Sequence, residues 1–139
     1  MTLIDIDVGP FALKARLELE RAPATSALFL GSLPVKDRLI HVRWSGEGCW
    51  IPMGDAHRIL PLENHGSTPA PGQFLYYPGG ISEAEILLAY GEVRFASKFG
   101  PLVGNHFMTV VEGSEHLAEI GRLTLWEGAL SIRFSSRKA

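Results

Sequence analysis

The clearest structural signal in the chain is FALKARLELE, residues 11–20. Apolar residues occupy every second position from Phe11 to Leu19, and charged residues fill the positions between them from Lys14 onward. A repeat of two residues places the apolar side chains on one face of a β-strand and the charged side chains on the other. The stretch therefore predicts a half-buried strand over residues 11–20.

Two short helices are expected, one directly after this strand and one near the end of the chain. Pro23 suits the first turn of a helix and Pro34 cannot continue one, so we predict a helix over residues 23–33. Ser114 is a favourable N-cap residue, and apolar side chains at helical spacing follow it. This pattern predicts a second helix over residues 114–122.

Short apolar runs separated by glycine and proline fill the rest of the chain and indicate further strands. The run over 82–90 is ambiguous, because Ser82 and Glu85 have capping-box spacing, whereas Gly80 and Gly91 bracket a run of strand length. We interpret it as a strand. The other predicted strands cover residues 36–44, 49–53, 73–77, 105–112 and 129–134.

Two helices cannot cover both faces of so large a sheet. Closing the sheet into a barrel removes its unpaired edges, and the helices can then plug the ends of the barrel. We therefore predict a mainly β protein, a closed β-barrel with two short capping helices. The length predicts a single domain over residues 1–139.

Composition narrows the range of partners and compartments. The 139 residues are 46% hydrophobic and 20% charged, with a formal net charge of -2, so neither nucleic acid nor a membrane is expected as a partner. Cys49 is the single cysteine, which argues against an internal disulfide and a multi-cysteine zinc site. No apolar run is long enough to cross a bilayer, and the first residues do not resemble a signal peptide. We therefore expect a cytoplasmic protein.

Two parts of the sequence resemble cyclophilins. Their opening strand and helix are similar to LELERAPAT, residues 17–25, followed by Phe29, and their C-terminal end is similar to VVEG, residues 110–113. The resemblance implies a cyclophilin-like barrel with a ligand groove on its outer face. The chain more closely resembles a bacterial cyclophilin-like family of unknown function, domain-of-unknown-function family 3830, in HVRWSGE (41–47), YPGG (77–80) with Glu83, and GNHF (104–107).

The chain departs from the prolyl isomerases among the cyclophilins at one motif. Those enzymes resemble one another in a Phe-Met-x-Gln run. Here Phe107-Met108 continues as Thr109-Val110 and lies in a different part of the chain. Because a fold does not carry an activity with it, we predict no appreciable prolyl isomerase activity.

His41 and Arg43 are the first candidate site residues. They share one face of the predicted strand 36–44, whose opposite face is apolar, so we expect them on a polar outer face. Arg43 could bind an anion or a carbonyl group through its planar guanidinium, with His41 as an acid, a base or a hydrogen-bond donor. The alternative is an ordinary ion pair of Arg43 with Glu47 or Glu85 on a solvated face.

Trp50 and Tyr77 are aromatic candidates beside glycine-rich turns. Trp44 and Trp50 flank residues 45–48. A five-residue loop would set the two indoles opposite each other, and a four-residue loop would set Trp50 opposite Arg43. The indoles could line a pocket for a flat ligand or pack within the sheet. Tyr77 precedes Pro78-Gly79-Gly80, whose amides could hold a carboxylate or simply connect two strands.

Glu83 and His106 complete the candidate set. Glu83 and Glu85 lie two residues apart on one side of the predicted strand, and they could perform acid–base work if one were desolvated. The alternative is a solvated pair of carboxylates. His106 begins a predicted strand, either at a groove entrance or as a satisfied core histidine. Cys49 is interpreted as a buried small residue.

The sequence predicts no metal site and no cofactor. The residues that could ligate a metal are scattered, without His-x-His or His-Glu-x-x-His spacing. These residues are His41, His57, His65, His106 and Glu63.

The function that follows is binding of a small polar or anionic molecule, with or without catalysis, in a groove on the outer barrel face. One open alternative is a peptide-binding module or vestigial prolyl isomerase. Another is a non-catalytic structural protein that forms homo-oligomers. The predicted ligand-binding residues are His41, Arg43, Trp50, Tyr77, Glu83 and His106.

Overall fold

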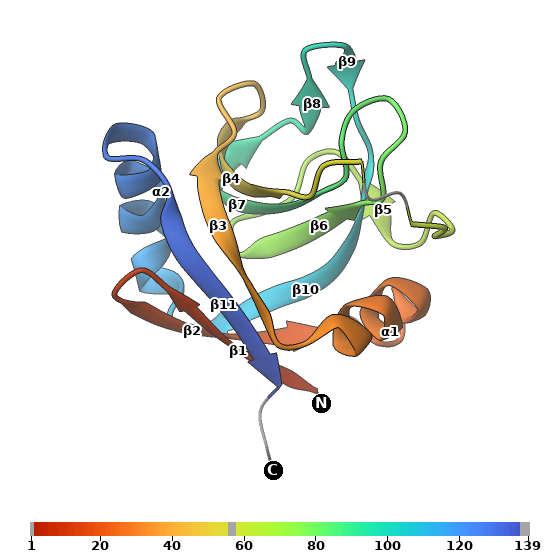
Figure 1. The fold of residues 1–139 in the computed structure, drawn as a ribbon, viewed down its shortest axis with the longest axis horizontal. Helices are drawn as coiled ribbons and strands as arrows, with labels where there is room; N and C mark the ends of the chain where they lie inside the picture. The colour runs from red at the N-terminus through yellow and green to blue at the C-terminus, as the bar shows by residue number, and fades with distance from the viewer. Residues whose placement is uncertain (1, 56–57, 137–139) are drawn as a thin grey trace.

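The computed structural model describes residues 2–55 and 58–136, and within these ranges eight antiparallel strands close into a barrel (Figure 1). Pairing between β2 and β10 completes the closure, so the predicted closed β-barrel is confirmed. A short strand, β5 (His65–Gly66), extends the sheet beside β10. In their order around the barrel the eight strands are β2 (Phe11–Leu17), β1 (Leu3–Val8), β11 (Leu130–Ser136), β3 (Val35–His41), β4 (Gly46–Pro52), β7 (Glu85–Val93), β6 (Gln73–Tyr77) and β10 (Gly104–Glu112).

The β1–β2 hairpin follows from the alternation in its sequence. In β2, Leu13, Ala15 and Leu17 point into the core, as the repeat of two residues predicts. The strand ends at Leu17 and not at residue 20, because the chain turns there and the Ala22 amide bonds to the Glu18 carbonyl oxygen. β1 was not among the predicted strands, although its alternation LIDIDV buries every second side chain in the same way.

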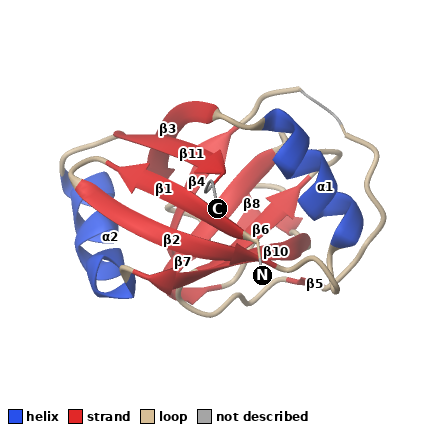
Figure 2. Cartoon of the chain, turned by 90° about the horizontal axis from the view of Figure 1, so that it is seen from below, coloured by secondary structure: helices blue, strands red, loops and turns tan. Residues whose placement is uncertain are grey.

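The two predicted short helices are confirmed, and they lie at opposite ends of the barrel (Figure 2). α1 (Pro23–Ser32) carries the Phe29 ring into the core, where it meets Phe107 edge-on at a centroid distance of 5.2 Å. α2 (Leu117–Trp126) follows a 3-10 turn, Ser114–His116, and continues beyond the predicted residue 122. Neither of these described helices has the length and apolar character that crossing a membrane requires.

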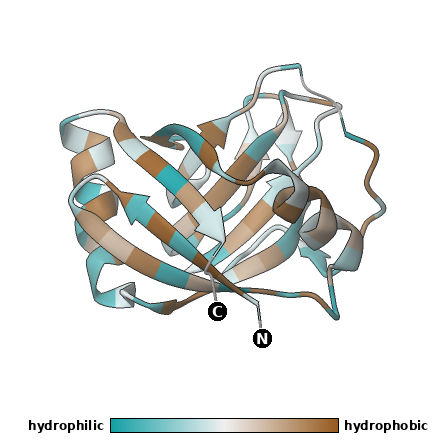
Figure 3. Ribbon diagram, turned by 60° about the horizontal axis from the view of Figure 1, so that its bottom comes forward, coloured by the Kyte–Doolittle hydropathy of each residue, from teal (hydrophilic) through white to brown (hydrophobic). Residues whose placement is uncertain are grey.

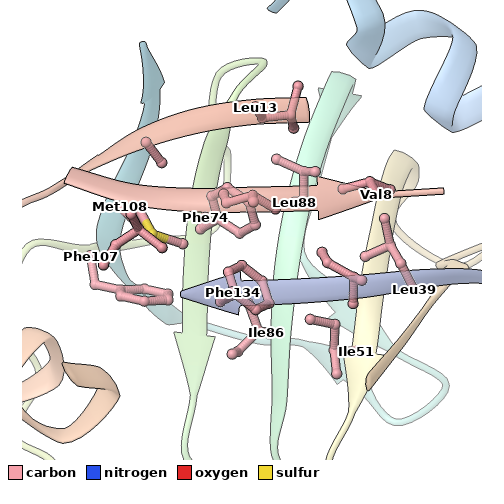
Figure 4. Packing of buried hydrophobic residues seen from close by; sticks show 14 of the residues in the cluster. Val8, Leu13, Leu39, Ile51, Phe74, Ile86, Leu88, Phe107, Met108 and Phe134 are labelled. Atoms are coloured by element: carbon pink, nitrogen blue, oxygen red, sulfur yellow. The ribbon is translucent and has the colours of Figure 1, made fainter. Parts of the chain in front are cut away.

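Large apolar side chains fill the barrel interior. Hydrophobic and hydrophilic bands alternate along several strands, because successive side chains point to opposite sides of the barrel wall (Figure 3). Inside, the Phe74 ring meets Phe107 and Phe134 edge-on, at centroid distances of 6.5 and 6.0 Å (Figure 4). Burial of these rings stabilises the barrel and holds its strands in a fixed register.

A second apolar cluster lies on the outer face of β4, β6 and β7. Ile86 of β7 points into the barrel and Leu87 points outward, yet both are buried. The cover is the segment after β7, which buries Phe95 and continues through the β8–β9 hairpin, Ala96–Ser97 and Gly100–Pro101. Burial on both faces explains the continuous apolar run in β7, which weakened its strand signal in the sequence.

Candidate functional site

A pocket of about 330 Å³ opens on the outer face of the barrel, next to the second apolar cluster. Its walls come from the β3–β4 connection, the residues that lead into β7, and the β8–β9 hairpin. We call it the aromatic pocket because it contains two indoles and a phenyl ring. The lining residues are Val42, Trp44, Ser45, Trp50, Ser82, Glu83, Glu85, Ala96, Ser97, Lys98 and Phe99.

Trp50 and Trp44 reach the pocket from different backbone settings. In β4, Cys49 and Ile51 point into the core, so the alternation of the strand sends Trp50 to the outer face. Trp50 pairs with Ile40 of β3, so neither predicted cross-strand partner of its indole is correct. Trp44 lies in the β3–β4 connection and is 69% exposed. The two indoles therefore line the same pocket without being opposite each other in the sheet.

The β8–β9 hairpin is held against the β3–β4 connection by one serine. The Ser45 hydroxyl donates to the Ala96 carbonyl oxygen and accepts from the Ala96 amide, both at 3.0 Å. The Arg94 amide also donates to the Ser45 carbonyl oxygen, at 2.9 Å. At the hairpin tip, Lys98 Nζ lies 5.3 Å from the centroid of the Phe99 ring. These contacts bring an aromatic wall and a cation to the pocket.

Glu85 is the buried acid of the pocket. It begins β7 on the same outward face as Leu87, and only 6% of the residue is exposed. Within the described ranges, no residue forms a side-chain hydrogen bond or ion pair with its carboxyl group. Burial, and to a smaller extent the charge of Glu83, raises the pKa of Glu85 to about 8. At neutral pH this carboxyl group is mostly protonated and can donate a hydrogen bond into the pocket.

Two further polar groups lie beside Glu85. Glu83 Oε2 accepts the Gly54 amide at 2.9 Å, and the Ala84 amide donates to the Gly54 carbonyl oxygen at 3.0 Å, which fixes the Glu83 carboxylate in the pocket wall. The Ser82 hydroxyl oxygen is buried, and none of the described residues hydrogen-bonds to it. Because buried polar groups in folded proteins rarely lack a partner, Ser82 and Glu85 mark this wall as unusual.

Comparison with known proteins places the chain in a family. A family model described as "Protein of unknown function (DUF3830)" matches residues 4–136, which is nearly the whole chain. The chain belongs to this family. The resemblance to family 3830 that the sequence predicted is thereby confirmed. No curated protein matches this DUF3830 member.

Two solved structures share its fold. McbB, solved in complex with tryptophan, superposes with a TM-score of 0.74 at 21% identity; the match covers 98% of this chain but only 45% of the McbB chain. The hypothetical protein AF2241 from Archaeoglobus fulgidus superposes with a TM-score of 0.64 at 17% identity, covering 98% and 95% of the two chains. Identities this low establish a common fold and leave function undetermined.

In this DUF3830 protein His41 and Arg43 lie outside the aromatic pocket. β3 ends at His41, so the predicted strand over 36–44 is wrong at its end; Arg43 has a φ of 57° and an exposed side chain. His41 shares the inward face of β3 with Leu39 and not a polar outer face. Its Nε2 lies 2.8 Å from the Tyr90 hydroxyl, and its Nδ1 accepts the Arg43 amide at 3.2 Å. Burial and then the Arg43 charge lower the pKa of His41, so the ring is neutral at pH 7.

Tyr77 supports the pocket wall from behind. It is buried, and its ring meets Phe95 edge-on at 5.8 Å. Its hydroxyl accepts the Ile81 amide at 2.9 Å and the Ser82 amide at 3.4 Å. Tyr77 thus holds the turn that carries Ser82, which is a positioning role.

His106 belongs to a separate polar chain. Asn64 Nδ2 donates to the His106 carbonyl oxygen at 2.8 Å and lies 3.3 Å from Nδ1, which makes Nδ1 an acceptor and leaves the ring proton on Nε2. Nε2 then donates to the Thr109 hydroxyl at 2.7 Å, and that hydroxyl donates to Glu18 at 3.1 Å. Burial, the largest influence, lowers the pKa of His106. The ring is therefore neutral and fully hydrogen-bonded, away from the aromatic pocket.

Of the six predicted site residues, the structure brings Trp50 and Glu83 together in the pocket. The predicted ligand-binding residues did not include Ser45, Lys98 and Phe99, because contacts between segments distant in the sequence place these three in the pocket. The part of the chain that the structure describes contains no cluster of three potential metal ligands, and His57 lies outside it, so the absence of a metal site stays a prediction.

Cys49 is buried, as predicted. Its Sγ lies 3.2 Å from the Thr124 hydroxyl oxygen of α2. Burial raises the pKa of the thiol to about 11, so the group stays protonated at neutral pH and is a poor nucleophile.

Proposed function

We propose that this protein binds a small, flat, polar molecule in the aromatic pocket. The observation that carries the proposal is the Glu85 carboxyl group, which is buried in the wall of an open cavity and has no hydrogen-bond partner among the described residues. A bound molecule with a hydrogen-bond acceptor would give that group the partner it lacks.

The size and the surface of the pocket indicate a small ligand with a flat apolar part. A volume of about 330 Å³ is at the lower end of the range for small-molecule sites. Trp44 and Phe99 are 69% and 67% exposed, and a flat ring stacked on them would remove apolar surface from water.

The charges of the lining favour a polar ligand over the anion expected from Arg43. Glu83 provides a fixed carboxylate, Glu85 is mostly uncharged at pH 7, and Lys98 is held over the Phe99 ring. The Glu83 carboxylate favours a ligand that carries a hydrogen-bond donor or a positive charge, whereas the protonated Glu85 carboxyl group favours an acceptor on the same ligand. McbB, which has this fold, was solved in complex with tryptophan, an indole that carries both an ammonium and a carboxylate group, and this supports the choice of indoles as probes.

The proposal is tested with three indoles that differ in charge. Indole, tryptamine and indole-3-acetate share a ring and are neutral, cationic and anionic at pH 7. Calorimetric titration should show tryptamine bound most tightly and indole-3-acetate most weakly. Failure of all three to bind at millimolar concentration, or a preference for indole-3-acetate, would contradict the proposal.

A matched pair of tryptophan variants locates the site. Trp44 lines the pocket, whereas Trp126 ends α2 and is 76% exposed. Trp44→Ala should weaken tryptamine binding by about fivefold to tenfold, because a stacked ring contributes about 1 kcal/mol beyond its area. Trp126→Ala should leave the affinity unchanged. Equal effects of the two substitutions would place the ligand elsewhere.

A second candidate function is binding of an apolar peptide side chain. The exposed side chains of Trp44 and Phe99 in the pocket lining favour it, since large apolar groups on a surface often mark an interaction site. A titration with short apolar and proline-containing peptides distinguishes the two candidates, because only the second expects them to compete with indole. Sedimentation at the same concentrations tests the remaining proposal, a homo-oligomer.

A further inference from the structure

We infer that Glu85 exchanges a proton with the molecule bound in the aromatic pocket, and thus acts as a general base toward a flat substrate with an acidic C–H or N–H group. This inference rests on the proposed function, because it requires a ligand in that pocket. It adds a reaction step that binding alone does not need.

The backbone around Glu85 is rigid on both sides. Glu85 pairs with Pro52 of β4 and with Tyr77 of β6, so the residue begins β7 between two neighbouring strands. Its side chain points to the outer face, into the pocket. A carboxyl group on a central strand keeps its position better than one on a loop, which proton transfer requires.

The groups that face Glu85 leave it free to react. Trp50 of β4 has no charge, and the Tyr77 hydroxyl of β6 is engaged with two backbone amides. Glu83, just before β7, accepts the Gly54 amide. Lys98 of the hairpin lies over the Phe99 ring and forms no ion pair with Glu85 among the described residues. No fixed partner therefore has to be displaced before Glu85 contacts a substrate.

The protonation state suits the chemistry. A carboxylate whose pKa is raised to about 8 is a stronger base than an ordinary glutamate, and near pH 8 both of its forms are present. In the proposed step the Glu85 carboxylate takes the proton from the substrate, and the electron pair of the broken bond remains on the substrate. The protonated carboxyl group then returns the proton to the product or to water.

The reaction of 5-nitrobenzisoxazole tests the step without knowledge of the natural substrate. This flat molecule loses its ring C–H proton to a base, the electron pair forms a nitrile, and the N–O bond breaks to release a coloured phenolate. No oxidant or metal is needed. The rate should rise with pH to a midpoint near 8, and Glu85→Gln should lower kcat/KM by about 100-fold or more.

Two controls separate this inference from the proposed function. Glu115→Gln changes an exposed carboxylate that does not line the pocket and should leave the rate unchanged. Binding of unreactive 5-nitroindole, followed by NMR, should change by less than about threefold in Glu85→Gln, since the ring contacts remain. Normal 5-nitroindole binding with a rate unaffected by Glu85→Gln would overturn the inference alone. Absent 5-nitroindole binding by the unmodified protein would overturn the proposed function, and the inference with it.

A second variant covers the case in which Glu85→Gln does not fold. Glu85→Asp keeps the carboxyl group but withdraws it from the pocket, and it should lower the rate by about tenfold while the pH midpoint remains near 8. A ¹³C titration of the glutamate carboxyl groups in the unmodified protein should contain one midpoint near 8. A rate equal to that of the unmodified protein, or no midpoint above about 6, would overturn the inference.

Discussion

Two glutamates of this protein are held in opposite ways. Glu63 accepts the Thr25 amide at 2.8 Å and the Thr25 hydroxyl at 2.9 Å, and Asn105 donates to the same hydroxyl at 3.0 Å. Glu85 has no comparable donors among the described residues and lines an open pocket. The hydrogen-bonding capacity of the Glu63 carboxylate, which joins α1 to the barrel, is thus used within the protein. The Glu85 carboxyl group in the pocket remains available to a ligand.

The largest expected difference in stability is between alanine substitutions of two phenylalanines, one in the barrel core and one at the pocket rim. Phe107 is fully buried, so Phe107→Ala should lower the free energy of unfolding by about 4 kcal/mol. Phe99→Ala should change it by less than about 0.5 kcal/mol and should weaken indole binding. Urea unfolding and calorimetry measure the two quantities. A rim variant as unstable as the core variant would show that the pocket wall is part of the core.

The pH dependence of stability should come from the pocket acid. Between pH 4.5, the ordinary pKa of the group, and about 8, the native state keeps the Glu85 proton that the unfolded chain releases. The stabilising contribution is therefore complete below pH 4.5 and is lost as the pH rises through about 8. We expect the free energy of unfolding to fall by roughly 4 kcal/mol across this range, because each pH unit over which the two states differ by one proton changes it by about 1.4 kcal/mol.

Glu85→Gln, which resembles the protonated acid, should flatten this part of the profile, and Glu115→Gln should preserve it. Urea unfolding at half-unit pH intervals measures the slopes. Parallel profiles for the unmodified protein and Glu85→Gln would mean that Glu85 is ionised at neutral pH, and the contrast with Glu63 would then disappear.

Removal of the Glu63 hydrogen bonds should lower the free energy of unfolding by less than the two changes above. Glu63→Gln replaces a carboxylate that accepts the Thr25 amide and hydroxyl by a neutral amide, and we expect a loss of about 1–2 kcal/mol in stability. Affinity for indole should not change, because the network lies outside the pocket. Hydrogen exchange should report the loss as faster exchange in α1, and uniform acceleration throughout the barrel would argue against a local role.

The smallest effect is expected at Arg43. Its side chain is exposed and does not line the pocket, so Arg43→Ala should change stability by less than about 0.5 kcal/mol and should leave tryptamine binding unchanged. The hypothesis of an Arg43 anchor, derived from the sequence, requires a loss of about 2–4 kcal/mol in binding instead. Calorimetry on this one variant decides between the two sites.

The barrel was predictable because its strands carry local signals. Residues 11–20 alternate, and β6 has the predicted bounds of 73–77. β7 was harder to recognise, since burial on both faces removes the alternation and Ser82 with Glu85 imitates a helix start. The strand interpretation of 82–90 was confirmed, but the strand begins only at Glu85.

The site was predictable only in part, because it forms between segments that no local pattern links. Trp50 and Glu83 could be named from residue type and position. The place of Lys98 and Phe99 depends on the bond between Ser45 and Ala96, which joins two distant loops. The prediction that Arg43 lies in a strand was wrong. Its backbone φ is positive, which is unusual for a residue with a Cβ atom, and this ends the strand alternation from which its position was inferred.

Strands β4 and β7 lie between the core and the pocket, and this position affects how the sequences of related proteins can diverge. In β4, Cys49 and Ile51 belong to the interior while Trp50 belongs to the pocket, and in β7 Ile86 and Leu87 divide in the same way. Neighbouring positions therefore meet different physical requirements, one set by the packing of the interior and the other by the pocket. A relative can exchange the outward residues and the three wall segments for others, and so acquire a new ligand, while the inward residues preserve an unchanged barrel.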